Sequence, residues 1–167
     1  MDITRYTEMV EGINWHKFDG SEYYKPENVP KSLVSLATVS QESIEGIYGG
    51  GVSVQLLLNP KTATDVLFAI GNGHSGTYYS SVRSALPFII EVALFGNTVV
   101  ARNCAINILI DLYFFCSEDN SIELEGFVKS SIHQAVSDNK ENFLQLAITD
   151  KRNKSLIESL IEISEGD

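Results

Sequence analysis

The stretch between residues 70 and 115 constrains the fold of this chain more than any other. It begins with a polar, glycine-rich turn at residues 71–76 (GNGHSG) and continues into two long apolar segments that only Gly96 and Asn97 separate. Such a pattern predicts two adjacent helices joined by a short turn. Pro87 lies inside the first segment, and proline lacks a backbone N–H, so we expect a kinked helix over residues 77–95. Asn97 or Thr98 can then cap the second helix.

The same turn matches the G-x-G-x-x-G fingerprint of dinucleotide-binding enzymes at Gly71, Gly73 and Gly76. That fingerprint requires a preceding strand, a following helix and an acidic residue about 20 positions further on, at the end of a second parallel strand. Residues 62–70 fit either a strand or a helix, but Glu91, the only acidic residue in range, lies inside the predicted helix. No second strand-turn-helix unit follows. We therefore favour a turn between helices, and a dinucleotide-binding enzyme ranks third among the functional hypotheses.

Helical spacing of apolar residues recurs along the rest of the chain. It predicts helices over about residues 3–13, from Pro30 to near Val39, and after Ser40, whereas residues 52–58 fit a strand or a helix. Three further helices are predicted from C-terminal apolar positions: Leu124, Phe127, Val128, Ile132 and Val136; Phe143, Leu146 and Ala147; Leu156, Ile157, Leu160 and Ile161. The predicted fold is all-α, a single domain over residues 1–167 of HEAT/armadillo-like stacked antiparallel helix pairs.

The composition is strongly acidic. The chain has 22 Asp and Glu residues against 12 Lys and Arg residues, a formal net charge of -10. Such a field repels nucleic acids and anionic membranes, because both bind cationic surfaces. It suits a cationic protein partner, although acidity can also serve solubility alone.

The sequence shows no targeting, membrane or metal signal. Its first residues lack a basic region followed by an apolar run, and polar residues between Arg102 and Asp111 interrupt the most apolar stretch. Cys104 and Cys116 are twelve positions apart on one predicted helix, roughly 18 Å at 1.5 Å per residue, so they cannot form a disulfide. We therefore expect a cytoplasmic protein without a metal or cofactor.

Acidic and aromatic residues are mixed in the segment between the first two predicted helices. This mixture is typical of protein–protein interfaces, where a few aromatic side chains contribute most of the binding energy. The candidate contact residues in this segment are Asp19, Glu22, Tyr23, Tyr24 and Glu27. A second acidic group, between Glu118 and Glu125, has the character of a solvated helix start and is the next candidate surface.

Further candidates lie in and after the glycine-rich turn. His74 can act as a catalytic base or stabilise the turn by hydrogen bonding, and the second role is favoured because no nucleophile is placed beside it. Tyr78 and Tyr79 can anchor a partner. Adjacent helical residues point about 100° apart, so one of the two tyrosines is expected to pack on the preceding helix.

Asn103, Asn107 and Asp111 recur every four residues and form a narrow polar ridge on an otherwise apolar helix. This pattern indicates a helix in the middle of an array, buried on most of its sides. The ridge either lines a concave groove, with Asn107 and Asp111 as partner contacts, or makes satisfied contacts between helices. The sequence leaves both alternatives open.

The order of these motifs resembles a known family. The run IGNGHSGTYY at residues 70–79 is followed by ALPFI at residues 85–89, by the Gly96-Asn97 turn and by an apolar helix. This order resembles bacterial HEAT-like helical-repeat proteins, in which a His-x-Gly-Thr-Tyr turn leads into a helix bearing Ala-x-Pro-Phe-Leu or a close variant. Members often act as immunity proteins beside polymorphic and contact-dependent growth-inhibition toxins. The match covers residues 70–112.

The resemblance implies an immunity protein, a monomer that binds a cognate cationic toxin domain 1:1 and occludes its active-site cleft. The expected toxin is a nuclease, because a nuclease attracts phosphates with a positive cleft, where an acidic protein can compete. The alternative is a cytosolic scaffold or regulatory adaptor of the same repeat class. Neither hypothesis involves a nucleic acid or a membrane as partner.

Overall fold

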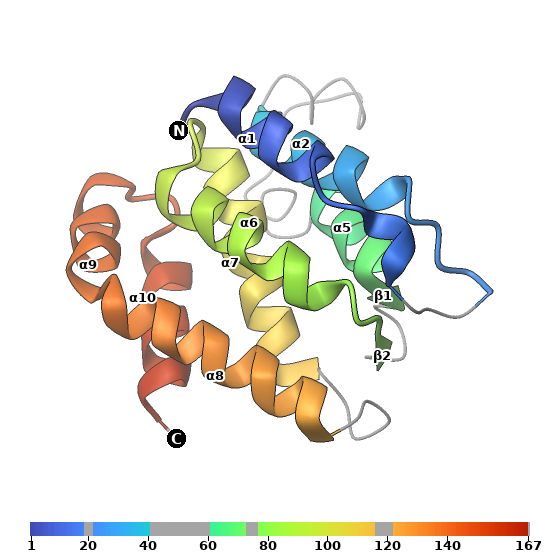
Figure 1. The fold of residues 1–167 in the computed structure, drawn as a ribbon. Coiled ribbons are helices and arrows are strands. Elements are labelled where there is room, and N and C mark those ends of the chain that lie inside the picture. Colours follow the sequence, from blue (N-terminus) through green and yellow to red (C-terminus); the bar gives the residue numbers. More distant parts are fainter. Residues whose placement is uncertain (19–21, 41–60, 73–76, 116–121, 167) are drawn as a thin grey trace.

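The computed structural model describes residues 1–18, 22–40, 61–72, 77–115 and 122–166. These residues are all-α apart from one short pair of strands (Figure 1). The elements are α1 (Ile3–Glu11), the 3-10 helix η1 (Trp15–Lys17), α2 (Asn28–Thr38), α5 (Lys61–Ile70), β1 (Gly71–Asn72), β2 (Thr77–Tyr78), α6 (Val82–Phe95), α7 (Val99–Phe115), α8 (Ile122–Asp138), α9 (Lys140–Thr149) and α10 (Lys154–Glu165). The predicted short helix after Ser40 and the ambiguous residues 52–58 lie outside the described residues.

α7 runs through the middle of the fold. It packs against α2, α5, α6, α8 and α10, and Figure 1 shows it behind α6. Ala101, Cys104 and Ala105 are fully buried, and their small side chains let the neighbouring helices approach closely. Burial also raises the pKa of the Cys104 thiol to about 12, so it stays protonated and inert. The prediction of a helix buried on most of its sides is confirmed.

The turn between α6 and α7 is tied to the N-terminal part of the chain. Thr98 is the N-cap of α7, because its Oγ1 accepts a hydrogen bond from the backbone N–H of Ala101 at 3.0 Å. The same hydroxyl donates to the Val39 carbonyl after α2, at 2.6 Å. Asn97 binds Met1 instead, with its Oδ1 accepting from the N-terminal ammonium at 3.0 Å. Of the two predicted caps, the structure uses Thr98.

The glycine-rich turn contains a short β-ladder that the sequence analysis did not predict. β1 and β2 pair antiparallel, with Gly71 opposite Tyr78 and Asn72 opposite Thr77. The helix expected over residues 77–95 therefore starts only at Val82, and the prediction was wrong for residues 77–81. Threonine and tyrosine favour extended backbone, and this preference prevails where a partner strand lies beside them.

Gly71 is required by the close approach of the two strands. A Cβ atom there would lie 2.4 Å from Cδ1 of Tyr78 and 2.6 Å from the carbonyl oxygen of Thr77. We expect Gly71→Ala to lower the free energy of unfolding by about 1–3 kcal/mol, because a backbone carbonyl cannot move aside as a flexible side chain can. Urea denaturation followed by circular dichroism measures this loss.

Gly126→Ala is the matched control for this prediction. Gly126 is exposed within α8, and a Cβ atom there meets nothing within 4 Å. Alanine is favoured over glycine in a helix by about 0.5–1 kcal/mol, so this variant is expected to be more stable than the parent protein. Equal effects of the two substitutions would contradict the close approach at Gly71.

The three C-terminal helices confirm the helical segments predicted there. Val128, Phe143, Ile157 and Leu160 are fully buried, at positions where the sequence predicts core residues. α10 packs on α7, α8 and α9, and Figure 1 shows α9 and α10 together at one side of the molecule. The α9–α10 hairpin thus closes one side of the core that α7 traverses.

Candidate partner-binding surface

The chain between α1 and α2 is held to the core by two side chains. Trp15 is buried, and its indole N–H donates to the carbonyl of Val10 near the end of α1, at 2.9 Å. That bond satisfies one of the carbonyls that a helix leaves free at its C-terminus. The Tyr24 hydroxyl donates to the Trp15 carbonyl at 3.0 Å. These two bonds attach both described parts of the loop to the end of α1.

An aromatic pair joins the same loop to the glycine-rich turn. The rings of Tyr24 and Tyr79 meet edge to face, with centroids 5.0 Å apart and planes at 62°. Such pairs contribute about 0.5–1.5 kcal/mol beyond the area they bury. Partial burial raises the pKa of the Tyr24 hydroxyl, which therefore stays a hydrogen-bond donor. Two features that the sequence analysis treated separately, the acidic loop and the tyrosines after the glycines, are neighbours.

Three residues of the loop are exposed beside this anchored part. The side chain of Tyr23 is 76% exposed, and Glu22 and Glu27 are exposed on either side of it in sequence. Glu27 precedes α2 and makes no side-chain capping bond to it. Glu22, Tyr23 and Glu27 are called the loop surface below. It presents an aromatic ring and two carboxylates near Tyr24, which Trp15 and Tyr79 hold in place.

The other predicted contacts in this region have different positions. Tyr24 is half-buried and anchors the loop, so its ring is only partly available to a partner. Tyr78 is 5% exposed, which places its ring in the core of the unbound protein. Tyr79 is buried as well, although only one of the two tyrosines was expected to pack inward. Asp19 and His74 lie outside the described residues.

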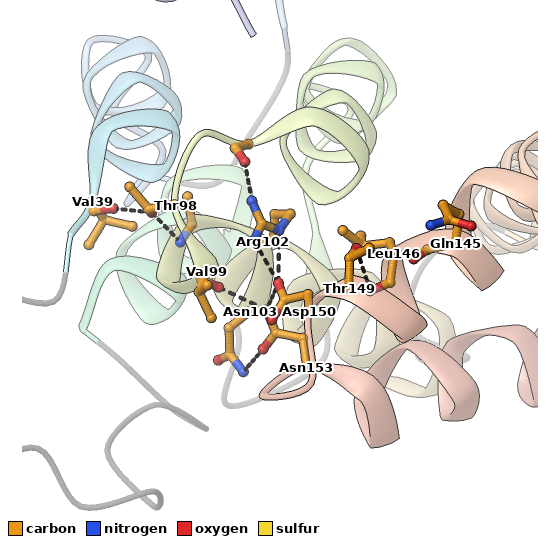
Figure 2. Close-up of polar contacts among 12 residues, drawn as sticks. Val39, Thr98, Val99, Arg102, Asn103, Gln145, Leu146, Thr149, Asp150 and Asn153 are labelled. Carbon is orange, nitrogen blue, oxygen red and sulfur yellow. Dashed lines mark hydrogen bonds and ion pairs between the residues drawn. The ribbon is translucent and has the colours of Figure 1, made fainter.

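The first residue of the polar ridge on α7, Asn103, contacts the turn between α9 and α10. Asn103 is buried, and its Nδ2 donates to Oδ1 of Asn153 at 2.8 Å (Figure 2). Asn107 is half-buried, and its Nδ2 donates to the backbone carbonyl of Asn103 at 2.9 Å. Asp111 is half-buried, and burial raises the pKa of its carboxyl group. Of the two alternatives, satisfied inter-helix contact is the correct one for Asn103.

A buried ion pair at the same place was missed by the sequence analysis. Nε and Nη2 of Arg102 donate to Oδ2 of Asp150 at 2.9 and 2.7 Å, and Nη1 donates to the Gly96 carbonyl at 2.6 Å (Figure 2). Asn153 completes the cluster by donating to Asp150 and to the Val99 carbonyl. The arrangement fastens the α9–α10 turn to the start of α7. The signal for this ion pair that the sequence offered was an arginine next to an asparagine in an otherwise apolar helix.

The ridge and the loop surface do not form one site. Asn103 faces the turn between α9 and α10, whereas the α1–α2 loop lies beside α5 and the β-ladder, on the opposite side of the view in Figure 1.

The fold context that a dinucleotide site requires is not found in the described part of the chain. A helix, α5, precedes the glycine-rich turn where the fingerprint needs a strand of a parallel sheet. The next helix starts at Val82, after β2, so its N-terminus does not follow directly on the glycines. Gly71 has a structural role in the ladder. No group of three or more potential metal ligands occurs among the described residues.

Comparisons with protein-family models, with curated proteins and with solved structures return no match for this chain. Among the described helices, none is long and apolar enough to cross a membrane.

Proposed function

We propose that this protein is an immunity protein: a cytoplasmic monomer that binds a cognate cationic toxin domain 1:1 and covers its active-site cleft. The expected toxin is a nuclease. The motif order of residues 70–112, the net charge of -10 and the all-α fold support the proposal. Under this proposal, the chain contains two HEAT-like helix pairs stacked side by side. One pair is α6 with α7, and the other is α9 with α10.

The loop surface is the observation that carries the proposal. Tyr23 is a large, exposed aromatic residue with exposed carboxylates on either side of it in sequence, and the adjacent Tyr24 is fixed by a hydrogen bond and a ring contact. A surface held in place before binding loses less conformational entropy when a partner docks. Tyrosine is also among the residues that most often dominate binding energy at interfaces.

Charge and aromatic contact are expected to act on different rate constants. Carboxylates that face a cationic cleft increase the association rate, whereas a desolvated aromatic ring slows dissociation. Raising the salt concentration from about 50 to 500 mM shortens the Debye length from roughly 14 to 4 Å, so it should lower the association rate and leave dissociation nearly unchanged.

Binding kinetics with the toxin domain test the proposal. The toxin to use is the basic C-terminal domain of an exported protein encoded directly upstream. We expect Glu22→Lys with Glu27→Lys to lower the association rate about tenfold or more at low salt. Tyr23→Ala should speed dissociation about 30-fold, which corresponds to about 2 kcal/mol.

Glu141→Lys with Glu162→Lys is the matched control. Both residues are exposed, on α9 and α10, and the change in net charge is the same. This control should lower the association rate far less than the loop variant, and all variants should keep the circular dichroism spectrum of the parent. If the two double variants behave alike, the loop surface is not the contact. If no basic toxin co-purifies with the protein, the scaffold hypothesis replaces the immunity hypothesis.

A further inference from the structure

A second surface lies on the α9–α10 hairpin, away from the loop surface. A hollow of about 680 Å³ opens there, lined by Leu144, Ala147, Ile148, Lys151, Lys154 and Glu158. Leu144 is 45% exposed and Ile148 is 68% exposed, one helical turn apart on α9. The adjacent face of α9 is already buried through Phe143. α9 is thus apolar on two faces, and only one of them is used by the core.

The charged residues that line this groove are two lysines and one glutamate, so its rim is net positive in an acidic protein. Lys151 and Lys154 line it at the α9–α10 turn, and Arg152 between them in sequence is exposed as well. Lys154 Nζ lies 3.7 Å from Oε1 of Glu158, and both side chains are more than half exposed, so this ion pair is weak. The turn therefore concentrates positive charge beside two exposed aliphatic side chains.

From this geometry we infer that the groove binds an acidic amphipathic helix of a second protein. Leu144 and Ile148 would receive the apolar face of that helix, as the apolar side chains of a groove do in helix-in-groove recognition. Lys151 and Lys154 would face its carboxylates. This inference does not rest on the proposed function, because the groove and the loop surface share no residue.

Two other occupants fit the observations less well. A second copy of the chain would bring a second charge of -10 to the same place, and like charges oppose association. An anionic membrane is broad and flat, so it would also meet Glu141 and Glu162, which are exposed on the same two helices.

Fluorescence anisotropy with defined peptides tests this inference on the full chain. The probe is a fluorescein-labelled helical peptide of roughly five turns, with leucines on one face and glutamates on the other. Two comparison peptides have lysine in place of glutamate or the same composition in scrambled order. We expect saturable binding of the glutamate peptide, and weaker binding of both comparison peptides.

Protein variants locate the binding. Ile148→Ser removes apolar contact at an exposed position and should weaken binding about tenfold. Lys151→Glu with Lys154→Glu should remove the preference for the glutamate peptide over the lysine peptide. Met9→Ser is the matched control, because Met9 is an exposed apolar residue on α1, and it should leave the affinity unchanged.

Several results would overturn the inference. These are no saturable binding of the glutamate peptide, equal binding of the lysine peptide, or full affinity in Ile148→Ser. Sedimentation velocity that shows a dimer dissociated by Ile148→Ser would assign the groove to a second copy. Co-sedimentation with phosphatidylserine vesicles that is lost in Lys151→Glu with Lys154→Glu would assign the groove to a membrane.

Discussion

Asp150→Ala is expected to lower the free energy of unfolding by about 3–5 kcal/mol, the range found when one member of a buried ion pair is removed. The side chains of Arg102 and Asp150 are 16% and 3% exposed, so water cannot replace the lost carboxylate freely. Two N–H groups of Arg102 and the amide of Asn153 would lose their acceptor together. The main source of the loss is a largely buried cation that has lost its anion and keeps only the Gly96 carbonyl as acceptor.

Asp65→Ala is the matched control for this prediction. Asp65 also pairs with a cation, Lys61, but that pair lies within one helix and both side chains are about half exposed. Exposed pairs of this kind contribute about 0.3–0.5 kcal/mol. Urea denaturation of both variants should therefore show a large loss for Asp150→Ala and a small one for Asp65→Ala. Similar losses would mean that the buried pair is solvated in solution.

The ion pair also shows what periodicity in the sequence could not reveal. Helical spacing correctly predicted α1, α2, α6, α7 and the three C-terminal helices, because each buries one or more faces of a regular pattern. Arg102 and Asp150 are 48 positions apart. Their pairing depends on how the α9–α10 turn packs against α7, and no local pattern encodes that packing. The same holds for Asn103, whose partner is Asn153.

The error at residues 77–81 has a related cause. Thr77 and Tyr78 directly precede a segment whose apolar residues have helical spacing. That spacing alone predicted a helix that included them. Their strand conformation depends on pairing with Gly71 and Asn72 across the turn. The absence of a Cβ atom at Gly71 permits that pairing, and this was a signal in the sequence.

The candidate surface was predictable in part. The sequence analysis named Glu22, Tyr23 and Glu27 as candidate contacts, and all three are exposed in the structure. Composition cannot tell which of two adjacent tyrosines points outward, because that choice depends on Trp15 and Tyr79, which lie elsewhere in the chain. The apolar groove on α9 was missed because Leu144 and Ile148 flank core residues and read as part of the same apolar segment.

Leu109→Ala is expected to lower the free energy of unfolding by about 2–5 kcal/mol. Leu109 is 1% exposed on α7, the helix that packs against α2, α5, α6, α8 and α10. Removing its side chain loses the transfer free energy of the deleted atoms and leaves a cavity. The surrounding helices can close that cavity only in part, because each is also held by its other neighbours.

Leu144→Ala makes the same chemical change at a position that is 45% exposed on α9. Its effect should be well below that of Leu109→Ala, because much of the leucine side chain is already in water in the folded protein. Urea denaturation of both variants compares the two losses of stability directly. The comparison requires the slope of the unfolding free energy against urea concentration to be the same in both variants. A loss below about 1 kcal/mol for Leu109→Ala would mean that neighbouring helices collapse into the space, as they do in a loosely packed core. A loss in the expected range, with a small effect at Leu144, requires α7 to be enclosed by helices that cannot move independently. That rigidity is what the buried ion pair and the Thr98 bonds at the start of α7 supply.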